Sequence, residues 1–133
     1  MKKFLLGVWL FLSTSLGLAQ MPEKTRQEVV QMPEETRQEV AQAIQQGNYT
    51  QAVQLLQPWA ERGDAWAQYR LGVMFFHGQG ITQDYAQAQK WWEKAAARGD
   101  ANAQFSLGVM CFHGQGVMQD YTQARKWWEK AAA

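Results

Sequence analysis

Two stretches of the chain are nearly identical and lie 36 residues apart, which limits the folds that the chain can adopt. Residues 64–97 (DAWAQYRLGVMFFHGQGITQDYAQAQKWWEKAAA) align without gaps with residues 100–133 (DANAQFSLGVMCFHGQGVMQDYTQARKWWEKAAA). A third, degenerate copy precedes them, in which residues 48–52 (NYTQA) match residues 84–88 (DYAQA). A period of this length is typical of arrays in which each repeat packs only on its neighbours.

Each repeat is predicted to contain two α-helices. Asp64 is a good N-cap for the first helix, which runs to about His77 and is broken by residues 78–80 (GQG). Asp84 caps the second helix, and Gln87 completes a capping-box pattern. The second helix ends at residues 98–99 (RG), where glycine permits a left-handed cap. Apolar residues recur at helical spacing in both helices. In the first helix they are Ala67, Leu71 and Phe75, and in the second they are Tyr85, Ala88, Trp92, Ala95 and Ala96.

The degenerate copy follows the same plan with two differences. Residues 35–46 supply its first helix, and Pro58 lies inside its second helix. Proline removes one helical hydrogen bond, so we expect it to kink or shorten that helix. A tandem duplication also precedes the repeats: residues 21–31 recur almost unchanged at 32–42. The second copy is expected to begin the first helix of the array, since Pro33 suits a first helical turn.

This pattern resembles the Sel-one-like repeat (SLR), a relative of the tetratricopeptide repeat. The matching residues of the first full copy are Ala67, Leu71, Gly72, Phe75, Gly78, Gly80, Ile81, Asp84, Ala88, Trp91, Lys94, Ala95, Ala96 and Gly99. The second copy matches at the equivalent positions, except those of Phe75 and Gly99. The resemblance implies an all-α fold, a short α/α solenoid of helix-turn-helix repeats forming a right-handed superhelix with a concave face. It also implies a role in protein–protein interaction.

Two features depart from the family pattern. Cysteine-rich secreted relatives brace each repeat with a disulfide, whereas this chain has one cysteine, Cys111. We expect Cys111 to be a buried small apolar residue, because Phe75 occupies the same position in the preceding copy; a reactive or intermolecular thiol is the alternative. The array also stops at Ala133 without the usual polar closing helix. The apolar side of its last helix pair is therefore expected to pair with itself, a partner or an N-terminal segment.

The N-terminal residues predict export. Lys2 and Lys3 precede an apolar run at residues 4–12, and small residues at 17 and 19 fit a signal-peptidase site after Ala19. The run is too short to span a bilayer comfortably, so no stable membrane insertion is expected after cleavage. We therefore divide the chain into a signal peptide (1–19), a polar N-terminal extension (20–33), a degenerate first repeat (34–63), a second repeat (64–99) and a third repeat (100–133). The protein is expected to be periplasmic or secreted.

Composition and motifs exclude several functions. The chain has 13 basic and 12 acidic residues, a balance that argues against a nucleic-acid surface. His77 and His113 lie before the glycine turns and lack neighbouring metal ligands, so neither a metal site nor a cofactor is expected. The tryptophan pairs at 91–92 and 127–128 suggest packing between helices, with carbohydrate stacking as the alternative.

The two full copies differ at eight positions, and three of the differences define a candidate binding face. Trp66/Asn102, Tyr69/Phe105 and Arg70/Ser106 lie on the side of the first helix away from Leu71. Tryptophan and arginine are enriched in interface hot spots. The predicted partner-binding residues are Trp66, Tyr69, Arg70 and His77, continued by Asn102, Ser106 and His113. Alternatively, Trp66 only packs on the preceding repeat.

These features predict an exported scaffold, not an enzyme, that binds a peptide or protein through the concave face of the first helices. One alternative is an envelope enzyme acting on cell-wall material or β-lactams, as claimed for some relatives. The other is a glycan-binding module that uses exposed tryptophans.

Overall fold

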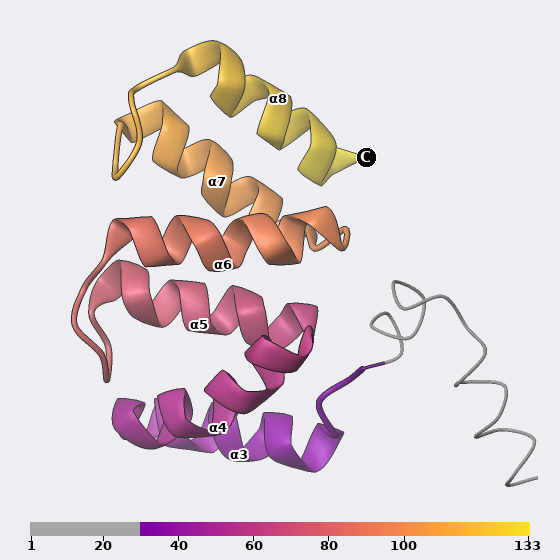
Figure 1. Ribbon diagram of the computed structural model, residues 1–133, viewed down its shortest axis with the longest axis vertical. Coiled ribbons are helices and arrows are strands. Elements are labelled where there is room, and N and C mark those ends of the chain that lie inside the picture. Colours follow the sequence, from indigo (N-terminus) through magenta and orange to yellow (C-terminus); the bar gives the residue numbers. More distant parts are fainter. Residues whose placement is uncertain (1–29) are drawn as a thin grey trace, which may run out of the picture. The chain divides into compact units, whose positions relative to one another are not determined.

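The two helices predicted for each repeat are present in the computed structural model, which describes residues 30–133 (Figure 1). This part of the chain is all α-helical, as predicted. The signal peptide and most of the predicted N-terminal extension lie outside it. Helix A of the three repeats is α3, α5 and α7, and helix B is α4, α6 and α8. Their bounds are α3 Glu34–Gln45, α4 Tyr49–Arg62, α5 Ala65–His77, α6 Tyr85–Ala97, α7 Ala101–His113 and α8 Tyr121–Ala132.

Helix starts are fixed by the capping residues that the sequence predicts, but not by complete capping boxes. The side chains of Asp84 and Asp120 accept a hydrogen bond from the backbone N–H three residues further on. The reciprocal bond, from the N–H of the cap residue to the side-chain oxygen of the glutamine, is absent. Instead, Asp84 N–H donates to the Phe75 carbonyl at 2.9 Å and Asp120 N–H to the Cys111 carbonyl at 2.8 Å. The preceding helix has unpaired carbonyls at its end, so the cap N–H bonds there and ties helix B to helix A.

The glycine turns allow the repeats to stack closely. Gly80 and Gly116 adopt left-handed φ values of 71° and 72°, which glycine tolerates without strain. A Cβ atom on Gly80 would collide with the backbone of Tyr49, and one on Gly116 would lie 2.5 Å from Cβ of Tyr85. The turn of each full repeat therefore lies against the start of helix B in the preceding repeat. Figure 1 shows the resulting order, in which the helix pairs follow one another through the unit formed by residues 31–133.

Pro58 does not shorten its helix, contrary to that part of the expectation. α4 continues to Arg62 and, at 14 residues, is the longest helix of the described residues. Pro58 and Gln54 are both exposed. The Gln54 carbonyl, which would accept the missing hydrogen bond, therefore lies on the solvent side, where water can satisfy it.

The core consists of small side chains that bring helices close together and a few large ones that fill the remaining space. Ala52, Ala67, Ala88, Ala95 and Ala103 are fully buried. Trp92 is buried against α5, where Gly72 leaves room for its indole ring: a Cβ atom on Gly72 would collide with it. The indole N–H donates to the Tyr69 carbonyl at 3.0 Å. Trp128 repeats this arrangement over Gly108.

Asp64 connects the segment before α3 to α5. Its carboxylate is buried and accepts hydrogen bonds from Ala67 N–H at 2.7 Å and from Met32 N–H at 2.6 Å. The Arg37 guanidinium lies 3.7 Å from the same carboxylate. Met32, which the sequence places in the polar extension, is thereby part of the core at 3% exposure. Asp64 thus fixes α3 and α5 relative to each other.

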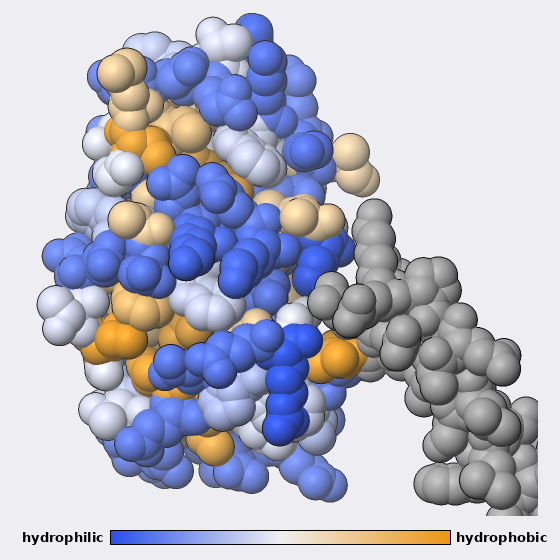
Figure 2. Space-filling view, in the orientation of Figure 1, coloured by the Kyte–Doolittle hydropathy of each residue, from blue (hydrophilic) through white to orange (hydrophobic). Residues whose placement is uncertain are grey.

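The outer side of the last helix pair exposes aromatic residues. Phe105, Phe112 and Tyr121 are 56%, 38% and 61% exposed, whereas their counterparts in the second repeat are half-buried against the core shared with α7. Figure 2 shows apolar patches along the edge that carries the turns within the repeats. None of the helices within residues 30–133 is long and apolar enough to cross a membrane.

We predict that Gly72→Ala destabilises the protein by about 1–3 kcal/mol, because the added methyl group displaces the Trp92 indole from α5. At an unconstrained helix position the same substitution stabilises by about 0.5–1 kcal/mol. Urea unfolding monitored by circular dichroism measures the difference. Gly108→Ala is the matched control, with a smaller expected loss because Trp128 is half-exposed whereas Trp92 is buried. A Gly72→Ala variant as stable as the parent would contradict this packing.

Candidate functional site

Helix A of the second repeat, α5, contributes to two hollows on its two sides. The first, which we call the α3–α5 hollow, has a volume of about 210 Å³ and is lined by Val40, Ala41, Ile44, Gln45, Trp66 and Arg70. The second, the α5–α7 hollow, has a volume of about 190 Å³ and is lined by Tyr69, Val73, Phe76, His77, Trp92, Ser106 and Val109. Both are lined chiefly by helix A residues, so they lie on the face that the sequence identifies as the candidate binding face.

Trp66 lies between two arginines. The Arg37 guanidinium carbon is 5.3 Å from the centre of the Trp66 ring, and that of Arg70 is 5.2 Å from it. Such cation–π contacts are worth about 0.5–2 kcal/mol and hold the ring in place. Trp66 is half-buried and packs against the core of the first repeat, as the alternative interpretation expected. It nevertheless also lines the α3–α5 hollow, so packing on the preceding repeat does not remove it from the surface.

Arg70 lines the α3–α5 hollow and also contacts Tyr69, which lines the α5–α7 hollow. Its guanidinium carbon is 6.0 Å from the Tyr69 ring centre as well as 5.2 Å from that of Trp66. Within residues 30–133, no carboxylate lies within 4 Å of it, and its Nε atom, like that of Arg37, is buried without a hydrogen-bond acceptor. Arg37, in contrast, is paired with Asp64. The arrangement places a cation without a paired anion between two aromatic rings.

The wall of the α5–α7 hollow is an aromatic cluster that the fold keeps rigid. The Phe76 ring centre lies 5.4 Å from that of Trp92 and 5.0 Å from that of Tyr85. The hydrogen bond from the Trp92 indole to the Tyr69 carbonyl fixes this cluster to α5. His77 is exposed at the end of α5 and contacts the edge of Phe76 at 5.0 Å. The hollow can therefore accept an apolar side chain with little rearrangement of its walls.

The structure brings together five of the seven residues that the sequence predicts. Trp66 and Arg70 line the α3–α5 hollow, and Tyr69, His77 and Ser106 line the α5–α7 hollow. Asn102 and His113 are exposed but line neither. The predicted list lacks the α3 residues, Val73, Phe76, Trp92 and Val109. Val73 and Val109 had a clear signal, since they occupy the same helical position in the two copies, three residues after Arg70 and Ser106.

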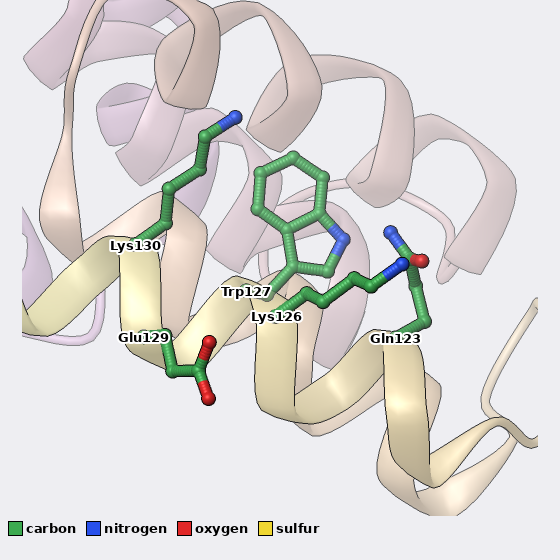
Figure 3. A pocket seen from close by; sticks show the side chains of 5 residues that line it. All are labelled: Gln123, Lys126, Trp127, Glu129 and Lys130. Atoms are coloured by element: carbon green, nitrogen blue, oxygen red, sulfur yellow. The ribbon is translucent and has the colours of Figure 1, made fainter.

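A third hollow, of about 470 Å³, surrounds Trp127 on α8 and was not predicted. Figure 3 shows the Trp127 ring between Lys130 on one side and Lys126 and Gln123 on the other, with Glu129 pointing away. The Lys130 ammonium lies 5.2 Å from the ring centre, as Lys94 lies 4.7 Å from Trp91 in α6. All of its lining residues come from one helix, so this hollow lacks the opposing wall that the other two have.

The repeat pattern is also recognised by comparison with protein families. The family model described as the Sel1 repeat matches residues 41–64, 67–100 and 101–133. The chain belongs to the Sel1 repeat family. The predicted all-α solenoid is therefore confirmed, and Sel1 repeat proteins generally mediate protein–protein interaction.

Solved structures of other Sel1 repeat proteins share this fold. A Sel1 repeat protein from Oxalobacter formigenes is 34% identical, with a TM-score of 0.60 over 62% of this chain and 34% of that chain. A protective antigen of uropathogenic Escherichia coli strains that displays an SLR fold is 38% identical, with a TM-score of 0.65 over 73% of this chain and 22% of that chain. The present chain thus spans about a third and about a fifth of their lengths.

Helicobacter pylori cysteine rich protein B is 22% identical, with a TM-score of 0.58 over 71% of this chain and 86% of that chain, which shows the fold alone. A search of curated proteins found no match.

The single cysteine of this Sel1 repeat protein is half-buried, not buried as expected. The equivalent Phe75 is also half-buried, so the position lies at the edge of the core. Burial raises the pKa of the Cys111 thiol, and the nearby carboxylates of Asp120 and Glu93 raise it further. The thiol is thereby kept protonated at neutral pH, which disfavours the reactive-thiol alternative. Within residues 30–133, no three side chains of His, Cys, Asp or Glu gather closely enough to hold a metal ion.

Proposed function

We propose that the protein is an exported scaffold that binds a peptide or protein segment through the helix A face, at the α3–α5 hollow and the α5–α7 hollow. The observation that carries this proposal is the position of Trp66, Tyr69 and Arg70. These three half-buried side chains of α5 line or separate two neighbouring hollows. Trp, Tyr and Arg are the residue types that contribute most to binding energy in protein interfaces.

The mechanism of such a scaffold is the presentation of preformed hollows. The Trp92 hydrogen bond and the Asp64 network hold the walls of the hollows in place before a partner arrives. Ordering flexible side chains on binding costs about 0.5–1.5 kcal/mol for each one. Walls that are already ordered avoid much of this cost, so a short segment can bind without a large interface.

An affinity capture tests the location of the site. The protein without residues 1–19 is incubated with envelope extract of a cell that expresses it, beside a Trp66→Ala, Arg70→Ala double variant. We expect the double variant to capture at most about a tenth of the partner that the parent protein captures, because the loss of hot-spot residues weakens binding at least tenfold. Trp127→Ala is the control, since it removes a half-buried tryptophan outside both hollows.

Equal capture by the parent and the double variant would place the site elsewhere. A loss confined to the Trp127→Ala variant would favour the glycan-binding alternative, and quenching of tryptophan fluorescence by glycans would support it. Saturable turnover of cell-wall material or a β-lactam by the purified protein would favour the envelope enzyme.

We also propose cleaved export to the periplasm or the outside of the cell, which rests on the sequence of residues 1–19. The full chain is expressed in a bacterium, the cells are fractionated and the mass of the product is measured. The expected product begins at Gln20 and lies outside the cytoplasm. A Leu6→Arg variant, which places a charge in the apolar run, should remain uncleaved in the cytoplasm. A parent protein that retains Met1 would contradict export.

We further propose that the outer face of α7 and α8 in the 133-residue chain pairs with the same face of a second copy. Its exposed aromatics, Phe105, Phe112 and Tyr121, are the counterparts of residues that form the interface between the second and third repeats. We expect light scattering to detect a dimer at high protein concentration. A Phe105→Ser, Tyr121→Ser variant should be monomeric under the same conditions. A parent that stays monomeric would contradict self-pairing.

A further inference from the structure

Arg70 is the only one of the two arginines around Trp66 that has no anionic partner within residues 30–133. Arg37 contacts the same ring, but its charge is offset by the buried carboxylate of Asp64 at 3.7 Å. Arg70 is held by the rings of Trp66 and Tyr69 and has no carboxylate within 4 Å among these residues, although the Nε atoms of both arginines are buried without an acceptor. A partly desolvated guanidinium without an anion is an unfavourable arrangement that binding of an anion relieves.

The surroundings of Arg70 specify what else the ligand must carry. Arg70 lines the α3–α5 hollow beside Trp66, and its guanidinium also contacts Tyr69, which lines the α5–α7 hollow. Val40, Ile44 and Val73 extend the apolar walls of these hollows. A ligand that fills both hollows and contacts the guanidinium must therefore place a negative group between two apolar groups.

We infer that Arg70 binds a carboxylate of the partner segment, whose apolar side chains on either side enter the two hollows. This inference rests on the proposed function and names the chemistry of its partner. A guanidinium stacked on aromatic faces keeps its edge free for two parallel hydrogen bonds to a carboxylate. In an extended peptide, alternate side chains lie on one face about 7 Å apart. The fitting sequence is therefore an acidic residue with apolar residues at the second position on either side.

The neighbouring repeat limits the site to one carboxylate. Ser106 and Asn102 occupy the positions of Arg70 and Trp66 in α7, so α7 offers no second cation at that position. The carboxylate belongs either to an acidic side chain within the segment or to the free C-terminus of the segment. These two sources present the same chemistry to Arg70, and the peptides used in the test distinguish them.

The test uses three synthetic peptides and isothermal titration calorimetry with the protein lacking residues 1–19. The first peptide is amide-ended, with glutamate at its centre, leucine at the second position on either side and serine or glycine elsewhere. The second has glutamine in place of the glutamate. The third ends at the central position with a free carboxylate. We expect at least one of the carboxylate peptides to bind about tenfold or more tightly than the glutamine peptide.

Four variants test whether the preference for a carboxylate comes from Arg70. Arg70→Gln should abolish the preference for the carboxylate, and Arg70→Lys should restore only part of it, because lysine keeps the charge but not the paired donors. Arg125→Gln removes the same charge from the exposed surface of α8 and should leave the preference unchanged. Trp66→Ala should weaken the binding of all three peptides.

Each remaining outcome overturns the inference. Equal affinity of the parent protein for the glutamate, glutamine and free-carboxylate peptides, with all three weakened by Trp66→Ala, would refute the carboxylate and leave the proposed function intact. A preference that persists in Arg70→Gln would assign the carboxylate to another group. No detectable binding of any peptide, or binding unaffected by Trp66→Ala, would refute both the inference and the proposed face.

Discussion

The packing of the Trp92 indole across Gly72 is the interaction on which both the stack and the hollows depend. Only glycine leaves room at that position, and the indole N–H reaches the Tyr69 carbonyl in the preceding turn of α5. Helix B is thereby fixed to helix A through a large apolar ring and a hydrogen bond at the same place. Trp92 also belongs to the core cluster that contains Ala103 and Leu107 of α7. One side chain thus connects the two helices of its own repeat with the helix A that follows.

The same contact explains why side chains of α5 are available for binding. Trp92 and Asp64 hold α5 from the core side, and Trp66 and Tyr69 add contacts at the edges of the two core clusters. The rings of Trp66 and Tyr69 also pack on the guanidinium of Arg70. Side chains ordered by such mutual contacts remain partly exposed yet lose little freedom on binding. In the proposed scaffold, Asp64 serves only the packing of the stack, whereas Trp66, Tyr69 and Trp92 contribute both to the packing and to the walls of the hollows.

Local signals were sufficient to predict the helices but not the walls of the hollows. Asp64, Asp84 and the glycine turns act within a few residues of their own positions, so the sequence reveals the helix ends directly. The capping boxes failed because a carbonyl of the preceding helix, brought close by the turn, competes with the glutamine side chain. The contribution of α3 to the α3–α5 hollow depends on how the first and second repeats, whose turns differ in length, pack on each other. Local sequence signals do not reveal this packing. The sequence predicts Trp92 to be a core residue, and in the structure it belongs both to the core and to the wall of the α5–α7 hollow.

The differences between the two full repeats show how such a stack acquires specificity without losing its fold. Gly72, Asp84 and Trp92 recur 36 residues later, whereas Trp66, Tyr69 and Arg70 are replaced. Substitutions at partly exposed positions change stability less than substitutions in the buried core. The helix A face can therefore differ from repeat to repeat while the packing that builds it stays the same. A cation present on α5 and missing from α7 would fix the register of the proposed acidic segment, because its charge meets Arg70 in only one register.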